Sequence, residues 1–255
     1  MRRFVLLAVC ALSASCASEA ATTVAERAIT PSSPTTSAVM DDAPVSTVAS
    51  RPVATSPPTT APAPTTEPTF SSSVETVAAS RLRFSWRPGC PVPPSDLRLL
   101  HVTFWGFDDR AQQGELVVQA RYAEPIVSVF AQLFDARYPI ERMELVDVYE
   151  GDNVRSMVAN NTSGFNCREV AGSPGVLSQH ALGNAIDVNP LINPWVHSGK
   201  VDPPEGAQYA DRAAGWKGAI YADDVVVRAF ASIGWGWGGY WPGSPDYQHF
   251  SANGQ

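Results

Sequence analysis

The chain has 255 residues and a formal net charge of −7 at pH 7. Its last 175 residues contain every Gly, Trp and Tyr, which is enough for one globular domain with a sizeable core. No Lys/Arg run or basic face occurs in this part of the chain, so its composition argues against a nucleic-acid partner.

The N-terminus has the pattern of an export signal. Arg2 and Arg3 precede the apolar run 4–12, and small residues lead up to Cys16. The run is shorter than the roughly 20 residues that a membrane-spanning helix needs. It resembles a bacterial lipoprotein signal, in which Cys16 is lipidated, while cleavage at an ordinary site nearby is the alternative. We therefore expect a signal peptide over 1–16 and an exported protein at the outer face of the membrane or in the cell wall, anchored by its lipid.

A linker is expected between the signal and the domain. Residues 17–80 are rich in Ala, Thr, Ser and Pro, with nine prolines and no glycine. Such a segment cannot bury enough apolar surface to offset its chain entropy, so it is predicted to be disordered. The globular domain is then expected over 81–255.

The domain is predicted to mix strands and helices. Glu124-Pro125 begins a helix whose apolar residues recur at helical spacing, and Pro139 ends it. The other expected elements are strands over 99–105, 115–121, 143–149 and 185–188 and a helix over 222–232. Because these elements lack a regular strand–helix–strand rhythm, we expect a single α+β domain with a mainly antiparallel sheet flanked by helices.

Cys90 and Cys167 are the two cysteines within the expected domain. In an exported protein, oxidising conditions make a disulfide between them the default, and two free thiols are the alternative. The bridge would hold the Pro-rich segment 87–94 against the loop that leads to His180.

Two short motifs contain candidate metal ligands. In Ser178-Gln-His-Ala-Leu-Gly-Asn-Ala-Ile-Asp187, Gly183 permits a close turn that brings His180 beside Asp187. A carboxylate in the predicted strand 185–188 is unfavourable unless a cation meets it. The second motif, Asp246-Tyr-Gln-His249, adds another imidazole. Two imidazoles and one carboxylate form a suitable zinc shell with a fourth position open for water, which is typical of a catalytic site.

The pattern Ser-x-His-x-x-Gly-x-Ala-x-Asp, followed by Asp-x-x-His, resembles the M15 metallopeptidases. These include D-alanyl-D-alanine carboxypeptidases and dipeptidases, with related wall endopeptidases. The resemblance extends over roughly 140–251, through Arg155-Ser156, Asn166-Cys167-Arg168 and the Trp-rich stretch 235–241. It implies a hedgehog/D-Ala-D-Ala peptidase-like fold and one zinc ion per domain.

The resemblance also implies catalytic roles. His180, Asp187 and His249 match the zinc ligands of the family. Asp246 matches its acidic general base, which takes a proton from the metal-activated water and passes it to the leaving amine.

Substrate contacts are predicted less directly. Arg155 matches an arginine that contacts substrate and stabilises charge on the attacked carbonyl. However, Val154 replaces the usual Tyr before it, and a surface salt bridge is the alternative role. Ser178 is a candidate for binding substrate. Trp235, Trp237 and Trp241 could line the cleft, although these tryptophans can equally pack in the core. Arg168 could bind a substrate carboxylate or brace its loop.

These assignments predict a zinc peptidase that cleaves D-Ala-containing stem peptides of peptidoglycan, most simply a monomeric D,D-carboxypeptidase. An endopeptidase that cuts the L-Ala-D-Glu bond or the cross-bridge is a second interpretation. A non-catalytic wall-binding module that contains zinc is a third. The open fourth metal position and Asp246 both argue against the third.

Overall fold

The computed structural model describes residues 67–255. The expected signal peptide, Cys16 and most of the expected linker lie outside the described residues. Among the helices of the described part, none has the length and apolar character needed to cross a membrane.

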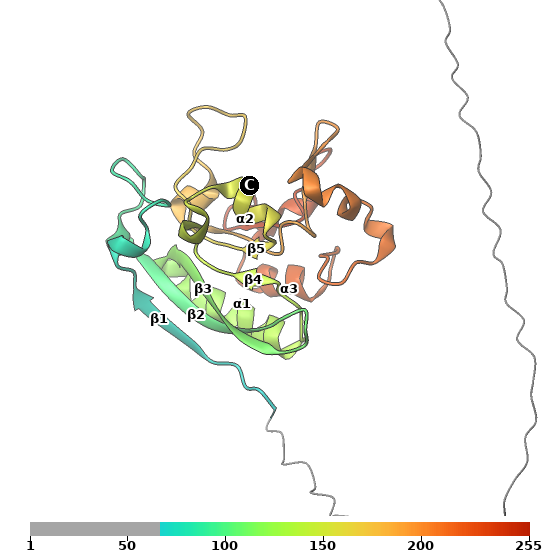
Figure 1. Ribbon diagram of the computed structural model, residues 1–255, viewed down its shortest axis with the longest axis horizontal. Helices are drawn as coiled ribbons and strands as arrows, with labels where there is room; N and C mark the ends of the chain where they lie inside the picture. The colour runs from blue at the N-terminus through green and yellow to red at the C-terminus, as the bar shows by residue number, and fades with distance from the viewer. Residues whose placement is uncertain (1–66) are drawn as a thin grey trace, which may run out of the picture. The chain divides into compact units, whose positions relative to one another are not determined.

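The first sheet has three antiparallel strands in the order β1-β2-β3 (Figure 1). Its strands are β1 (Ser72–Thr76), β2 (Leu97–Trp105) and β3 (Ala111–Gln119). β2 and β3 form a hairpin whose register pairs Leu97 with Gln119 and Trp105 with Ala111. The hairpin therefore has the two strands that the hydrophobic pattern predicts, but β3 begins four residues earlier than expected.

β1 corrects the expected boundary of the linker. It lies before residue 81, yet its backbone pairs with β2 from Ser72↔Val102 to Thr76↔Arg98. Most side chains of β1 are exposed, so the strand does not need the apolar residues that would distinguish its composition from that of a linker. Main-chain hydrogen bonds and the partly buried Val74 hold this edge strand, and composition carries no signal for the hydrogen bonds.

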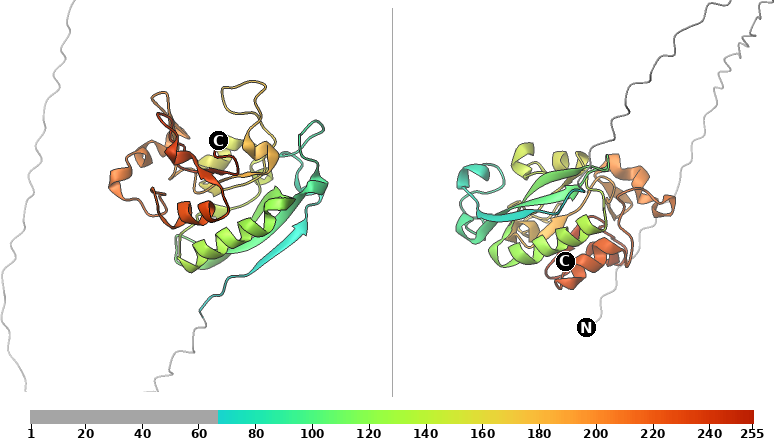
Figure 2. Two further views of the ribbon diagram at one scale, coloured as in Figure 1. Left: turned by 180° about the vertical axis from the view of Figure 1, so that it is seen from behind. Right: turned by 90° about the horizontal axis from the view of Figure 1, so that it is seen from below.

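One helix covers a face of this sheet, and a second helix lies beside the first (Figures 1 and 2). α1 (Ala123–Asp135) packs on β2 and lies beside α3 (Val225–Ser232). α3 begins where the Asp224 side chain accepts hydrogen bonds from the Val226 and Val227 N–H groups. Both helices agree with the sequence analysis, which predicted α1 from its apolar stripe and α3 from its start and stop signals.

A second three-stranded sheet contains both predicted metal-binding motifs. Its order is β6-β10-β9, and all its pairs are antiparallel. The strands are β6 (Ala185–Asp187), β9 (Gly236–Trp237) and β10 (His249–Ser251). Ile186 and Phe250 join the core beneath α1 and α3, with the Phe250 ring 4.1 Å from that of Phe230. Successive side chains on a strand alternate, so the residues next to them face the opposite side.

The remaining strands are short, and α2 (Asn153–Val158) precedes β5. β4 (Arg142–Met143) pairs in parallel with β5 (Asn161–Thr162), while β7 (Trp195–His197) and β8 (Lys200–Asp202) form an antiparallel hairpin. The 3-10 helices are Ala79–Arg81, Pro94–Asp96, Ala120–Tyr122, Val146–Tyr149, Gln179–Leu182, Pro204–Ala210, Arg212–Ala214 and Gly238–Tyr240. Helices and mainly antiparallel small sheets together confirm the α+β class.

The expected strand over 143–149 is wrong beyond Met143. Val146–Tyr149 forms a 3-10 helix instead. The Asp147 carboxylate accepts hydrogen bonds from the Phe84 N–H at 2.7 Å and the Ser85 hydroxyl at 2.5 Å. These long-range contacts outweigh the strand propensity of the apolar run.

The predicted disulfide joins Cys90 to Cys167 across 77 positions of sequence. Two hydrogen bonds reinforce it, because Cys167 N–H donates to Ser85 O at 2.9 Å and Arg87 Nη1 donates to Cys167 O at 2.7 Å. The disulfide and these hydrogen bonds attach the segment 85–90 to the loop that leads to the second sheet.

Candidate metal centre and active site

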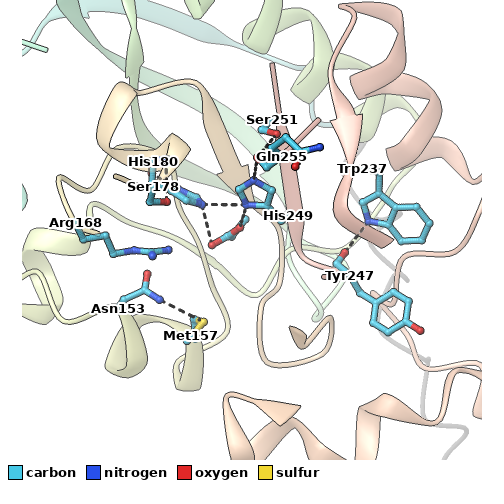
Figure 3. A network of polar contacts seen from close by, with 12 residues as sticks. Asn153, Met157, Arg168, Ser178, His180, Trp237, Tyr247, His249, Ser251 and Gln255 are labelled. Carbon is cyan, nitrogen blue, oxygen red and sulfur yellow. Dashed lines mark hydrogen bonds and ion pairs between the residues drawn. The ribbon is translucent and has the colours of Figure 1, made fainter. Parts of the chain in front are cut away.

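The three predicted ligands meet in one buried cluster (Figure 3). Asp187 Oδ2 lies 3.1 Å from His180 Nε2, and Asp187 Oδ1 lies 3.0 Å from His249 Nδ1. The two imidazole nitrogens are 3.3 Å apart. Three potential ligand atoms therefore converge on one point, as a mononuclear metal site requires.

A tight turn positions His180. The Ser178 hydroxyl accepts the His180 N–H at 3.3 Å at the start of the 3-10 helix Gln179–Leu182. Gly183 ends the helix with φ +66°, and its carbonyl accepts the Gln119 N–H of β3 at 2.7 Å. A Cβ atom at position 183 would lie 2.7 Å from that nitrogen, so only glycine allows this contact.

A main-chain oxygen lies behind each histidine ring, next to the ring nitrogen that does not face Asp187. His180 Nδ1 lies 2.7 Å from Gly164 O, and His249 Nε2 lies 3.1 Å from Gln255 O. These main-chain oxygens only accept, so the proton of each neutral ring is on the nitrogen that faces the oxygen. His180 Nε2 and His249 Nδ1 then keep free lone pairs toward Asp187. This arrangement fits zinc, whose histidine ligands almost always donate their other N–H to such a partner.

The electrostatics of the cluster also suit a cation. Burial lowers the pKa of His180 and so favours its neutral form. Burial acts to raise the pKa of Asp187, but the two histidines outweigh it and hold that pKa well below its usual range. For His249 burial acts to lower the pKa, and the hydrogen bond and charge of Asp187 raise it overall. The cluster thus retains an anionic carboxylate with which a divalent cation can pair.

A pocket of about 410 Å³ lies over the cluster. Its walls come from α2, from the loop 168–179 and from the β7–β8 hairpin. Three exposed hydrophobic residues line its mouth: Val154, Val176 and Leu177. Ser178 also lines the pocket, where it was expected. The pocket therefore combines a polar, metal-competent floor with an apolar entrance, as small-molecule and peptide sites commonly do.

Asp246 is a half-buried residue on the pocket floor, and its Oδ1 atom is fully covered. Gly238 allows this placement, because a Cβ there would lie 2.7 Å from Asp246 O. Within residues 67–255, the Asp246 Oδ1 atom has no hydrogen-bond partner. Burial raises the pKa of Asp246 to about 7. A carboxylate with a pKa near neutrality suits proton transfer at physiological pH.

The structure does not bring Arg155 to the pocket. Its Nη1 lies 2.9 Å from Glu150 Oε2, and both side chains are more than half exposed. On α2 the pocket is lined by Asn153, Val154 and Met157 but not by Arg155. Residues 153 and 157 are one helical turn apart and share a face, whereas the side chain at 155 points elsewhere. The surface salt bridge, which was the alternative for Arg155, is the arrangement found.

Arg168 occupies the pocket instead. Its guanidinium points toward the histidine cluster above Asn153 (Figure 3). Its Nε is buried without a hydrogen-bond partner among the described residues, and burial lowers the pKa of the group against the charges of Asp187 and Asp246. An unpaired buried donor beside a cluster of ligands is available to an anionic or carbonyl group of a substrate.

Trp237 is also not where the cleft prediction placed it. Its ring is buried in the core beside Phe250, and its Nε1 donates to Tyr247 O at 2.9 Å. β9 pairs Trp237 with Phe250, which explains why both rings face the core. Of the three candidate tryptophans only Trp241 lines the pocket, with its ring centroid 5.5 Å from that of His249.

Sequence reasoning missed the hairpin wall of the pocket. Trp195 and Asp202 both line the pocket, and His197, which does not line it, connects the two. The His197 ring stacks on Trp195 at 3.7 Å, while His197 Nε2 lies 2.7 Å from Asp202 Oδ2. The Ser-Gly turn at 198–199 between two short polar-aromatic segments is a hairpin signal that could have located this wall.

Residues 171–252 match the model of a protein family described as D-alanyl-D-alanine carboxypeptidase. This match supports an M15 family peptidase. The segment that matches the M15 peptidases contains His180, Asp187, Asp246 and His249 but neither candidate arginine. No curated protein and no solved structure gives a match to the chain.

Proposed function

We propose that the protein is a zinc-dependent peptidase that hydrolyses D-Ala-containing stem peptides of peptidoglycan, in the simplest case as a D,D-carboxypeptidase. The buried His180–Asp187–His249 cluster on the floor of an open pocket carries this proposal. The family match over 171–252 supports it, because it includes the whole cluster. The proposal includes the hedgehog/D-Ala-D-Ala peptidase-like fold that the resemblance implies.

His180, Asp187 and His249 would hold one zinc ion. When bound, zinc lowers the pKa of a coordinated water and supplies a nucleophile near neutral pH. Asp246 is proposed as the general base, since its unpartnered Oδ1 is free to take a proton from the attacking water. Asp246 would then return the proton to the leaving amine, and its raised pKa makes both transfers feasible at neutral pH.

Arg168 is proposed to take the role that the resemblance suggested for Arg155. Its guanidinium lines the pocket, while that of Arg155 is paired with Glu150 outside the pocket. A fixed cation that donates to the oxygen of the attacked carbonyl stabilises the negative charge that develops there. The same group could instead bind the terminal carboxylate of a substrate, which would favour the carboxypeptidase over the endopeptidase.

The apolar mouth of the pocket is consistent with a peptide that carries small aliphatic side chains such as that of D-Ala. We further propose that the protein is exported and acts at the cell wall as a monomer, held by a lipid on Cys16 and the linker that follows it.

The decisive experiment uses defined muropeptides. The purified protein is incubated with pentapeptide and cross-linked substrates, with and without a chelator, and the products are identified by mass spectrometry. Chelator-sensitive loss of a terminal D-Ala supports the carboxypeptidase, and internal cleavage supports the endopeptidase. Zinc binding without any metal-dependent product would overturn the enzymatic proposal in favour of a wall-binding module.

A further inference from the structure

Residues 251–255 form a closed turn directly after β10, which we call the 251–255 turn. The Ser251 hydroxyl donates to Gln255 O at 2.7 Å, and Gln255 N–H donates to Asn253 Oδ1 at 3.1 Å. The Gly254 N–H donates to Ser251 O at 3.2 Å, and Trp241 Nε1 donates to Gly254 O at 2.8 Å. Side chains and main chain together therefore fix the position of Gln255.

The 251–255 turn holds the main-chain oxygen of Gln255 in one position. Gln255 O accepts from Ser251 and also lies 3.1 Å from His249 Nε2, on the side of the ring away from Asp187 (Figure 3). One main-chain oxygen can accept from both of these donors at once. The oxygen thus has a defined partner in His249.

We infer that the 251–255 turn is a positioning element for the metal ligand His249, acting through the main-chain oxygen of Gln255. This inference rests on the metal site of the proposed function. The strand β10 places the backbone of His249 opposite Asp187, but it does not decide which ring nitrogen faces the metal. Rotation about the last side-chain torsion of histidine is broad and roughly two-fold. An acceptor at Nε2 removes that freedom, because it keeps the proton on Nε2 and leaves Nδ1 as the ligand.

The other ligand histidine has an equivalent arrangement. His180 Nδ1 lies 2.7 Å from Gly164 O, so a carbonyl also stands behind that ring. Gly164 O belongs to the buried interior, whereas Gln255 O belongs to a short turn that can be altered without cutting the core. Variants in the turn around Gln255 can therefore test the positioning of His249 without disrupting the folded core.

The test compares two variants by their zinc affinity, measured in competition with a chelating dye. Deletion of residues 253–255 removes the acceptor of His249 Nε2. Gln255→Ala is the matched control, because it changes the side chain and keeps the main-chain oxygen. We expect the deletion to bind zinc about 10- to 100-fold more weakly and Gln255→Ala to bind within about twofold of the parent.

A second measurement distinguishes loss of the contact that positions His249 from a general loss of rigidity of the protein. In the zinc-loaded protein, the His249 Nε2 proton should exchange slowly with water in NMR spectra because Gln255 O holds it. The deletion should make this proton exchange rapidly, while the Gln255→Ala variant should keep it protected. A deletion that keeps parental zinc affinity and a protected proton overturns the inference.

Two outcomes distinguish this inference from the proposed function. A parent protein that binds zinc, together with an unaffected deletion, overturns only the inference about the turn. A parent protein that binds no zinc overturns the proposed function and the inference with it. If the deletion fails to fold by circular dichroism, Asn253→Ala decides, because it removes the acceptor of the Gln255 N–H. At least threefold weaker zinc binding supports the inference, and parental affinity overturns it.

Discussion

Asp187 lies directly opposite His249 in the antiparallel pairing of β6 with β10, although the two are 62 positions apart in sequence. The strand register itself therefore sets the 3.0 Å distance between Asp187 Oδ1 and His249 Nδ1. A slip of one residue would turn Phe250 toward the pocket and His249 into the core. The packing of Phe250 on Phe230 opposes that slip, so the hydrophobic core maintains the geometry of the candidate metal site.

Asp246→Asn should abolish turnover while leaving zinc in place. Asparagine has nearly the same shape but cannot accept a proton, so kcat is expected to fall about 10²- to 10⁴-fold. Bound metal measured by atomic absorption should stay at the parental level. A variant that retains near-normal hydrolysis of the pentapeptide would show that another group is the base.

The metal-free protein should lose stability as the pH rises toward neutrality, in part because of Asp246. Its pKa in the folded protein is about 7, above its ordinary value, so the folded state keeps a proton that the unfolded state releases. Its contribution is thus most favourable below the unfolded pKa of about 4 and is lost as the pH rises through about 7. Asp246→Asn should therefore raise the melting temperature more at pH 8 than at pH 4. Equal shifts at both pH values would contradict this.

The two arginines form a matched pair for mutation. Arg168→Ala should lower kcat/KM about 10- to 1000-fold, since it removes the cation that lines the pocket. Arg155→Ala should change kcat/KM less than about twofold, because its exposed pair with Glu150 lies outside the pocket. The initial rates of D-Ala release measure both. The reverse ranking would restore the role that sequence resemblance suggested for Arg155.

Gly183→Ala should destabilise the protein through a steric contact. The new Cβ would lie 2.7 Å from Gln119 N in a left-handed conformation, and a loss of roughly 2–4 kcal/mol is expected. Gly172→Ala is the control, because its φ is also positive and nothing lies within 4 Å of the new Cβ. That control should lose only about 1–2 kcal/mol from backbone strain. Urea titrations compare them, and equal losses would rule out the contact with β3 as the cause.

Removal of the disulfide should destabilise the domain. Cys90→Ser with Cys167→Ser releases a crosslink over 77 positions and is expected to cost about 2–5 kcal/mol. Thermal melting of the double variant and of the parent with a reductant should give matching decreases. If neither treatment lowers the melting temperature, the bridge does not contribute to folding stability.

The amino-acid sequence by itself determined the chemistry of the candidate site and the helices beside it. The motif around His180 and Asp187 and the later Asp246-x-x-His249 motif identified the cluster, because residue type and spacing limit what such a group can bind. The apolar stripe of α1 likewise predicted its buried face. These features depend on local pattern, which a single sequence contains.

Only the tertiary structure decided which arginine and which tryptophan reach the pocket. Arg155 and Arg168 are equally basic in sequence, but the helix face of α2 directs one outward while the loop after Cys167 directs the other inward. Trp237 and Trp241 differ in the same way, because β9 turns Trp237 toward Phe250. The oxygen behind His249 is a main-chain atom, which every residue possesses, so no residue type could have indicated it. The direction of a side chain and the position of a main-chain acceptor depend on packing between segments that are distant in sequence. Only the tertiary structure therefore determines them.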